Sequence, residues 1–91
     1  MNIKWTSKGN SDLVRLHEFL VSVNPRAAAN AVRALVAAAG RLTEHPRIGE
    51  KLEQYEPLEV RRILVSDYEM RYEIRNSTIY ILRLWHTREH R

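Results

Sequence analysis

The chain contains no cysteine among its 91 residues. This absence excludes disulfide bridges and thiolate metal ligands, and it is typical of a protein in a reducing compartment. Only three glycines are present, and no glycine-rich phosphate-binding loop is recognisable. No apolar run approaches the ~20 residues of a membrane-spanning helix, and the charged N-terminal segment does not resemble a secretory signal. We therefore expect a cytoplasmic protein with no membrane contact.

The basic residues are distributed unevenly. The chain has 15 Lys and Arg residues against 11 Asp and Glu residues, a formal charge of +4. Residues 61–91 contain arginine but no lysine, and most of the excess lies there. Because a guanidinium group donates paired hydrogen bonds to carboxylates and phosphates, the pattern indicates an acidic protein or nucleic acid as partner. A solvated strand face rich in arginine is an equally simple interpretation.

The first half of the chain predicts a short strand at residues 3–5 and then two helices. Thr6 and Ser7 are suitable caps for the first helix. Asn24 and Pro25 predict the joint to the second helix, because Asn caps well and Pro suits the first helical position. The alanine-rich second helix favours close packing in an antiparallel hairpin, and Pro46 predicts its end. The two apolar stripes consist of Leu13, Leu16, Phe19, Leu20 and Val23, and of Ala28, Ala31, Leu35, Ala38 and Leu42.

From residue 60 onward the hydrophobic period changes to two. Residues 60–65, 68–74 and 78–86 predict three strands, with a turn at Asn76 and Ser77 between the last two. A two-residue loop would place Met70 opposite Arg83, whereas a three-residue loop would place Glu69 opposite Arg83. We favour the three-residue loop, because it pairs opposite charges and gives a more apolar core.

These elements predict one domain that spans residues 1–91. Residues 47–58 form a connector with irregular turns between the second helix and the three final strands. The fold class is α+β, with a helical hairpin packed on one face of an antiparallel sheet in the order β-α-α-β-β-β.

This order of elements resembles the ParE/RelE superfamily of toxins from type II toxin–antitoxin systems. The resemblance covers nearly the whole chain. It depends on the Asn24-Pro25 joint, on the segment LTEHPRIG at residues 42–49, and on three strand motifs. These motifs are RRILV at residues 61–65, YEMRYEI at 68–74 and ILRLWHTRE at 81–89.

The resemblance implies a toxin that a cognate antitoxin neutralises by wrapping a segment around it. ParE-like members of the superfamily poison DNA gyrase, whereas RelE-like members cut messenger RNA on the ribosome. The implied complex with the antitoxin is a hetero-oligomer. The resemblance also implies a role in growth inhibition and plasmid stabilisation.

The residues favour the ParE-like activity over the nuclease. The RelE-like pattern has two strand lysines, which fall on Val60 and Arg62, and an arginine that falls on Glu69. Its late arginine matches Arg88, but its terminal tyrosine has no counterpart before the chain ends at Arg91. A carboxylate at position 69 would repel phosphate at close range. We therefore expect a gyrase inhibitor, with a ribosome-dependent endoribonuclease as the alternative.

The candidate site residues follow from these two readings. A nuclease would need Arg62, His86 and Arg88, since imidazole titrates near neutral pH and guanidinium groups hold phosphate. Contact with the target is predicted for Arg62, Arg83, His86, Arg88 and Arg91. Contact with the antitoxin is predicted for Arg61, Arg71 and Trp85. The scattered histidines suggest no metal site, and we expect no cofactor.

Overall fold

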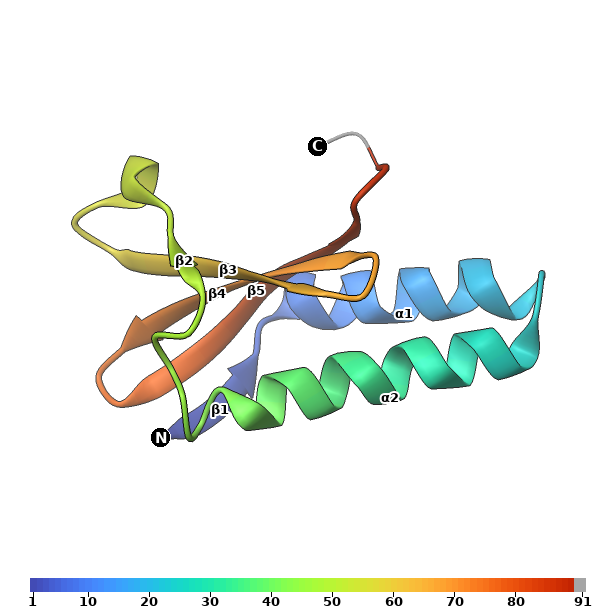
Figure 1. Cartoon of the computed structure of the whole chain (residues 1–91), viewed down its shortest axis with the longest axis horizontal. Helices are drawn as coiled ribbons and strands as arrows, with labels where there is room; N and C mark the ends of the chain where they lie inside the picture. The colour runs from blue at the N-terminus through green and yellow to red at the C-terminus, as the bar shows by residue number, and fades with distance from the viewer. Residues whose placement is uncertain (90–91) are drawn as a thin grey trace.

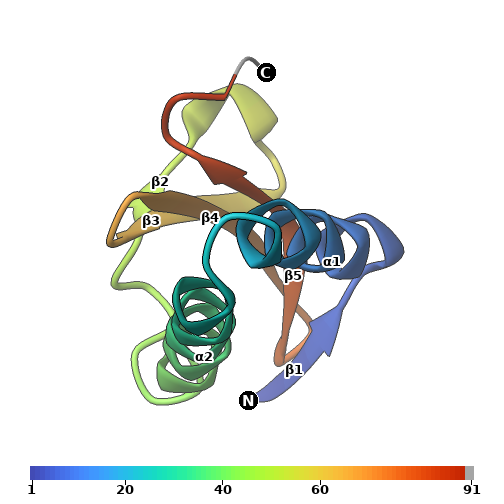
Figure 2. The same ribbon diagram turned by 90° about the vertical axis from the view of Figure 1, so that its right-hand side faces the viewer.

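The computed structural model describes residues 1–89 and contains two helices and a five-stranded sheet. Helices α1 (Ser7–Val21) and α2 (Pro25–Arg41) form an antiparallel hairpin that covers one face of the sheet, as Figures 1 and 2 show. The strands are β1 (Asn2–Trp5), β2 (Glu50–Lys51), β3 (Glu59–Val65), β4 (Tyr68–Arg75) and β5 (Thr78–His86), with the short 3₁₀ helix η1 (Glu53–Tyr55). The expected α+β class is confirmed.

The sheet is mixed rather than wholly antiparallel. Its order is β1-β5-β4-β3-β2. Strand β1 pairs with β5 in parallel, whereas all other neighbours are antiparallel. The two-residue strand β2 lies within the segment that the sequence suggested was an irregular connector, because two residues are too few to show a period of two.

The N-termini of the two helices follow the sequence signals closely. The Thr6 hydroxyl accepts a hydrogen bond from the Gly9 backbone N–H, and the Asn24 side chain accepts from the N–H groups of Arg26 and Ala27. Helix α2 ends at Arg41, a full turn before the proline that was expected to stop it. The residues between Arg41 and Pro46 form successive turns instead.

The register between β4 and β5 differs from the one that we favoured. Arg75 pairs with Thr78 across a two-residue loop, so the three-residue loop was wrong. A bulge then shifts the pairing, since Tyr72 lies opposite Ile81 whereas Arg71 lies opposite Arg83. Without this shift Arg83 would face the core opposite Met70. The bulge therefore places Arg83 on the outside and Leu84 inside.

The core lies between the helical hairpin and the inner face of the sheet. Its fully buried members come from α2 and the central strands, and they include Leu35, Leu42, Met70, Tyr72, Ile79, Ile81 and Leu84. The expected stripe of the second helix is buried at Ala28, Leu35, Ala38 and the cap residue Leu42, and half-buried at Ala31. Of the apolar stripe expected for the first helix only Leu16 is buried, whereas Phe19 and Val23 are exposed, because the hairpin extends past the sheet (Figure 1). No helix in residues 1–89 is long and apolar enough to cross a membrane.

Candidate functional site

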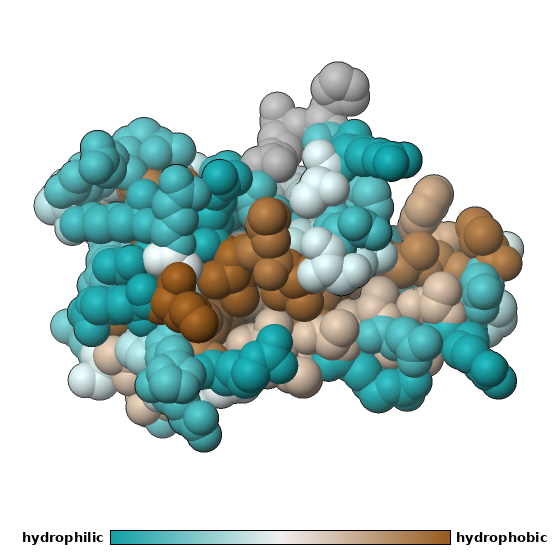
Figure 3. All heavy atoms as spheres, viewed as in Figure 1, coloured by the Kyte–Doolittle hydropathy of each residue, from teal (hydrophilic) through white to brown (hydrophobic). Residues whose placement is uncertain are grey.

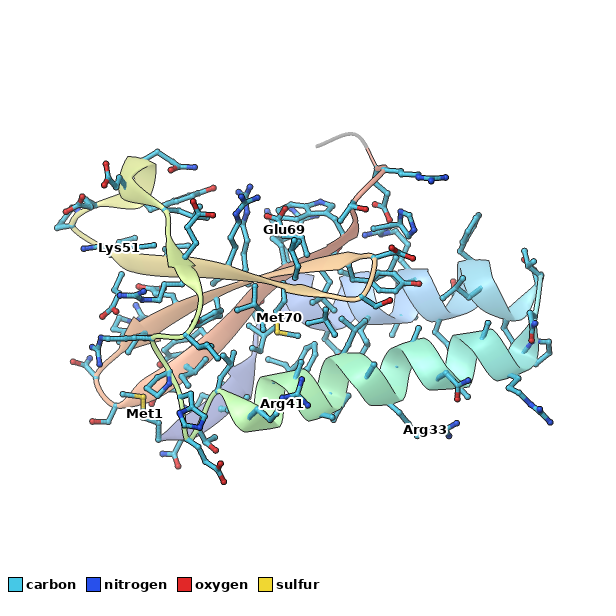
Figure 4. All side chains as sticks on the ribbon, in the orientation of Figure 1. Met1, Arg33, Arg41, Lys51, Glu69 and Met70 are labelled. Carbon is cyan, nitrogen blue, oxygen red and sulfur yellow. The ribbon has the colours of Figure 1, made fainter. Side chains whose placement is uncertain are left out.

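Three arginines lie next to one another on the outer face of the sheet, the face opposite the α1–α2 hairpin. They are Arg62 of β3, Arg71 of β4 and Arg83 of β5, and neighbouring strands place them side by side. We call them the arginine layer. Figure 4 shows Glu69 on this outer side, whereas the next residue, Met70, points toward the helices. The alternation expected for β4 is therefore confirmed, and its charged face is the outer one.

A buried carboxylate lies beneath the arginine layer. Glu69 has no exposed surface, and Arg71 Nε donates to it over 2.8 Å. Arg62 Nη1 lies 3.5 Å from the same carboxylate, and Arg62 Nε donates to Glu50 over 2.7 Å. An unpaired buried carboxylate would cost several kcal/mol, so these contacts explain how Glu69 stays inside. Arg62 and Arg71 are thus already neutralised in large part.

The indole of Trp85 lies under the same layer. The guanidinium carbons of Arg71 and Arg83 are 4.8 and 5.0 Å from the ring centroid, which is within range for cation–π contact. Trp85 is 8% exposed. Because Arg71 and Arg83 face each other across the strands, the indole and the nearby carboxylates offset the repulsion between them.

Asp12 of α1 holds Arg83 from the edge of the sheet. Arg83 Nε donates to Asp12 over 2.7 Å, and the Leu84 backbone N–H donates over 2.9 Å. Burial by itself would raise the pKa of Asp12, but the hydrogen bonds from Arg83 and Leu84 outweigh it and lower the pKa. Asp12 thus connects α1 to Arg83 and Leu84, the part of β5 that no longer pairs with β1.

The histidine predicted for the site lies on the opposite face of the sheet. The rings of His86 and Tyr68 meet edge-on, with centroids 5.4 Å apart. His86 Nδ1 accepts a hydrogen bond from the Arg88 backbone N–H over 3.1 Å. Both residues line a groove of about 470 Å³ beside α1, together with Phe19. Burial, and then the negative charges of two nearby carboxylates, raise the pKa of Tyr68.

The remaining candidates are spread over the molecule. Arg61 points to the inner side, where it donates to Glu59 over 2.9 Å and to the Gly49 carbonyl over 2.7 Å. It thereby fastens the segment between α2 and β2. Arg91 lies outside the described residues. The structure therefore brings Arg62, Arg71, Arg83 and Trp85 together and places Arg61, His86 and Arg88 elsewhere.

An apolar groove runs between α2 and the edge of β3. Strand β2 pairs only with Arg61 and Arg62, so in the described part of the chain no strand covers Ile63 to Val65 on that side. Figure 3 shows hydrophobic side chains gathered in this hollow. The groove measures about 490 Å³, and its lining includes Ala38, Arg41, Leu42, His45, Ile48, Ile63, Leu64 and Val65. Ile48 and Leu64 are 70% and 65% exposed.

The described residues offer no metal centre. Between residues 1 and 89 the structure brings no three His, Asp or Glu side chains close enough to hold a metal ion.

Comparison with known proteins assigns the family. The model described as "ParE toxin of type II toxin-antitoxin system, parDE" matches residues 3–91. The chain belongs to this ParE toxin family. Toxin RelE1 of Caulobacter vibrioides is 34% identical to this toxin over 88 residues, which cover 92% of this chain and 90% of that protein. A chain in the solved structure "Chromosomal ParDE TA system from P. aeruginosa" has a TM-score of 0.77 at 25% identity, with 92% of both chains covered.

The expected membership of the ParE/RelE superfamily is thereby confirmed, and the protein is a toxin of a type II toxin–antitoxin system. Sequence reasoning had placed neither Asp12 nor the groove residue Ile48 in a site. Asp12 stands on the buried face of an amphipathic helix, a position where a carboxylate needs a partner. Its place on this helix face could therefore have identified Asp12 from the sequence. The groove could not have been identified in this way, because it exists only where the two-residue strand β2 leaves the edge of β3 uncovered.

Proposed function

We propose that the toxin acts by binding DNA gyrase and not by cutting RNA. The observation that carries this proposal is the division of the candidate nuclease residues between two faces of the sheet. His86 pairs with Tyr68 on the inner side, whereas Arg62 pairs with Arg71 on the outer side. A general base must lie within hydrogen-bond reach of the same substrate group that the phosphate-binding cation holds.

The state of each group also supports binding over catalysis. His86 Nδ1 is occupied by the Arg88 backbone N–H, and Arg62 is held by two carboxylates. An arginine that stabilises a transition state must be able to direct its donors at the developing charge. The exposed parts of Arg62 and Arg83, together with His86 and Arg88, are our candidates for contact with the target.

The test uses purified toxin in a gyrase supercoiling assay with relaxed plasmid. We expect loss of supercoiling or accumulation of cleaved plasmid as toxin is added. Variants Arg83→Ala and Arg88→Ala test the two candidate contact regions, and Arg33→Ala on the exposed side of α2 is the matched control. Unchanged supercoiling at a large excess of folded wild-type toxin would reject the proposal.

A RelE-like ribonuclease is the second candidate. It is favoured by the cluster of Arg15, Tyr68, His86 and Arg88 at one end of the groove beside α1, and by the name of the Caulobacter relative. The phenol and imidazole there could transfer protons while the arginines hold phosphate. Translating ribosomes provide the test, since codon-specific cleavage that His86→Gln abolishes would favour this candidate over gyrase binding.

We propose that a cognate antitoxin docks in the groove between α2 and β3. The uncovered edge of β3 offers backbone groups for an added strand, and the apolar floor offers burial for a helix. Arg41 and Arg62 at the rim favour acidic residues in the partner. A wrapping segment that continues onto the outer face would also meet Arg71 and Trp85, and Arg61 supports the groove from the side of Gly49.

Co-purification with the product of an adjacent gene tests this docking site. Leu64→Glu places a charge on an exposed groove residue, and we expect it to weaken the complex at least tenfold. Leu58→Glu is the matched control, because Leu58 is 50% exposed and does not line the groove. Equal loss of binding in both variants would contradict the assignment of the groove.

A further inference from the structure

The three arginines of the arginine layer carry almost no uncompensated charge. Arg62 lies between Glu50 and Glu69, Arg71 pairs with Glu69, and Arg83 pairs with Asp12. These are three cations and three carboxylates. A phosphodiester backbone binds through cations that exchange their small counterions for phosphate. Cations that already hold carboxylates release few counterions, so the arginine layer is a poor nucleic-acid surface despite its arginines.

The three carboxylates are not equivalent. Glu50 is exposed, and its side chain is free to leave Arg62 when a phosphate approaches. Asp12 is committed to the Leu84 backbone N–H as well as to Arg83. Glu69 alone lies within the sheet face and contacts two of the three arginines, and it stands between Leu64 and Trp85 in the strands on either side.

Burial holds the Glu69 side chain in one position. Its side chain has no exposed surface, so it cannot swing into solvent and release the guanidinium groups. Arg71 Nη1 is also bonded to the Tyr55 hydroxyl over 2.9 Å, which holds that arginine down over the sheet. A phosphate at the arginine layer would therefore meet a fixed negative charge behind the cations.

We propose that Glu69 is a specificity-determining residue that closes the outer face of the sheet to phosphodiester backbones. It neutralises Arg62 and Arg71 from beneath and leaves the face suited to contact with a protein. This inference deepens the proposed function, because it explains how a basic toxin would act on a protein target without competing binding to RNA.

The test measures binding of a short fluorescein-labelled oligouridylate by anisotropy over a range of salt concentrations. Wild-type toxin is expected to bind weakly with a shallow salt dependence. Glu69→Gln keeps the shape and removes the charge, and we expect affinity at low salt to rise about tenfold, as gain of one charge-assisted contact implies. The slope of log affinity against log salt should steepen by about 0.7 for each phosphate newly contacted.

The matched control is Glu73→Gln. Glu73 lies four residues further along the same strand on the same face and is similarly buried. It stands opposite Val60 and Tyr80, whereas Glu69 contacts Arg62 and Arg71. Glu73→Gln removes the same charge from the chain, but we expect it to raise the affinity for the oligouridylate less than twofold. Equal gains in the two variants would show a net-charge effect and overturn the proposal, as would tight, salt-dependent binding by wild-type toxin.

If Glu69→Gln does not fold alone, the same comparison is made in an Arg62→Gln background, where like-charge repulsion is lower. The double variant should still bind the oligonucleotide more tightly than Arg62→Gln, and no difference would overturn the proposal. The assay contains no gyrase. A failure of the gyrase proposal therefore leaves this result unaffected, and the two failures are distinguishable.

Discussion

Replacement of Asp12 by alanine is the most informative test of how the fold supports the outer face. The carboxylate accepts the Leu84 N–H at a point where β1 has ended and where, within residues 1–89, no other strand covers the edge of β5. It also orients Arg83. Asp12→Ala removes both functions at once, whereas Asp12→Asn retains an oxygen that can accept from Leu84.

The expected loss follows from the two contacts. A buried N–H left without an acceptor costs about 1–3 kcal/mol. The Arg83 side chain is 38% exposed, so solvent screens its ion pair and the pair contributes at most ~1 kcal/mol. We therefore expect Asp12→Ala to lower the free energy of unfolding by about 1–4 kcal/mol, a large share of the ~5–15 kcal/mol typical of small domains. Asp12→Asn should lose about half as much.

Urea denaturation followed by circular dichroism measures both variants. The control is Glu18→Ala, which removes an exposed carboxylate from the same helix and should change stability by less than ~0.5 kcal/mol. A loss below ~1 kcal/mol for Asp12→Ala, at an unchanged dependence on urea, would refute the claim that Asp12 closes the edge of β5.

Three further outcomes are expected. Gly9→Ala should lower stability by about 1–3 kcal/mol in urea denaturation, because a Cβ there would overlap a β5 backbone carbonyl, whereas Gly40→Ala, with open space around it, should not destabilise. Tyr72→Phe loses a buried hydroxyl with two hydrogen-bond partners and should cost about 1–3 kcal/mol by the same measurement. The pKa values of Asp12 and Glu59 are lower in the folded protein than in free carboxyl groups, so the two ionised carboxylates stabilise the fold at neutral pH. In an acid titration, the free energy of unfolding should therefore fall as the pH drops through these lowered pKa values.

The sequence was sufficient to predict most of the fold because its local signals agree with the tertiary structure. Asn24 and Pro25 mark the helix joint, and the change of period near residue 60 marks the start of the strands. These features act over a few residues and need no knowledge of distant contacts. The parallel pairing of β1 with β5 was not predictable in this way, since it joins the two ends of the chain.

The register of the last hairpin shows where local reasoning fails. The two-residue loop at Asn76 and Ser77 was rejected because a regular ladder would have buried Arg83 opposite Met70. The structure keeps that loop and places Leu82 at a bulge, which turns Arg83 outward. A bulge is one extra residue with no strong sequence signature, so charge pairing suggested the wrong register.

The candidate site was predictable in composition but not in arrangement. Arginine enrichment after residue 60 identified Arg62, Arg71 and Arg83, and strand alternation together with the bulge at Leu82 places these on one face. The same alternation places His86 on the opposite face of the sheet, because His86 pairs with Tyr68 in the register of β4 and β5. From the sequence we considered Glu69 as a departure from a nuclease pattern and as a partner of Arg83. Its burial beside Arg62 and Arg71 depends on three strands at once.

One parallel measurement tests the central claim, that the toxin acts on gyrase and not on RNA. The same preparation of folded toxin is added to gyrase with relaxed plasmid and to ribosomes translating a defined message. We expect loss of supercoiling in the first reaction and an intact message in the second. Codon-specific cleavage of the message together with unaffected supercoiling would contradict it.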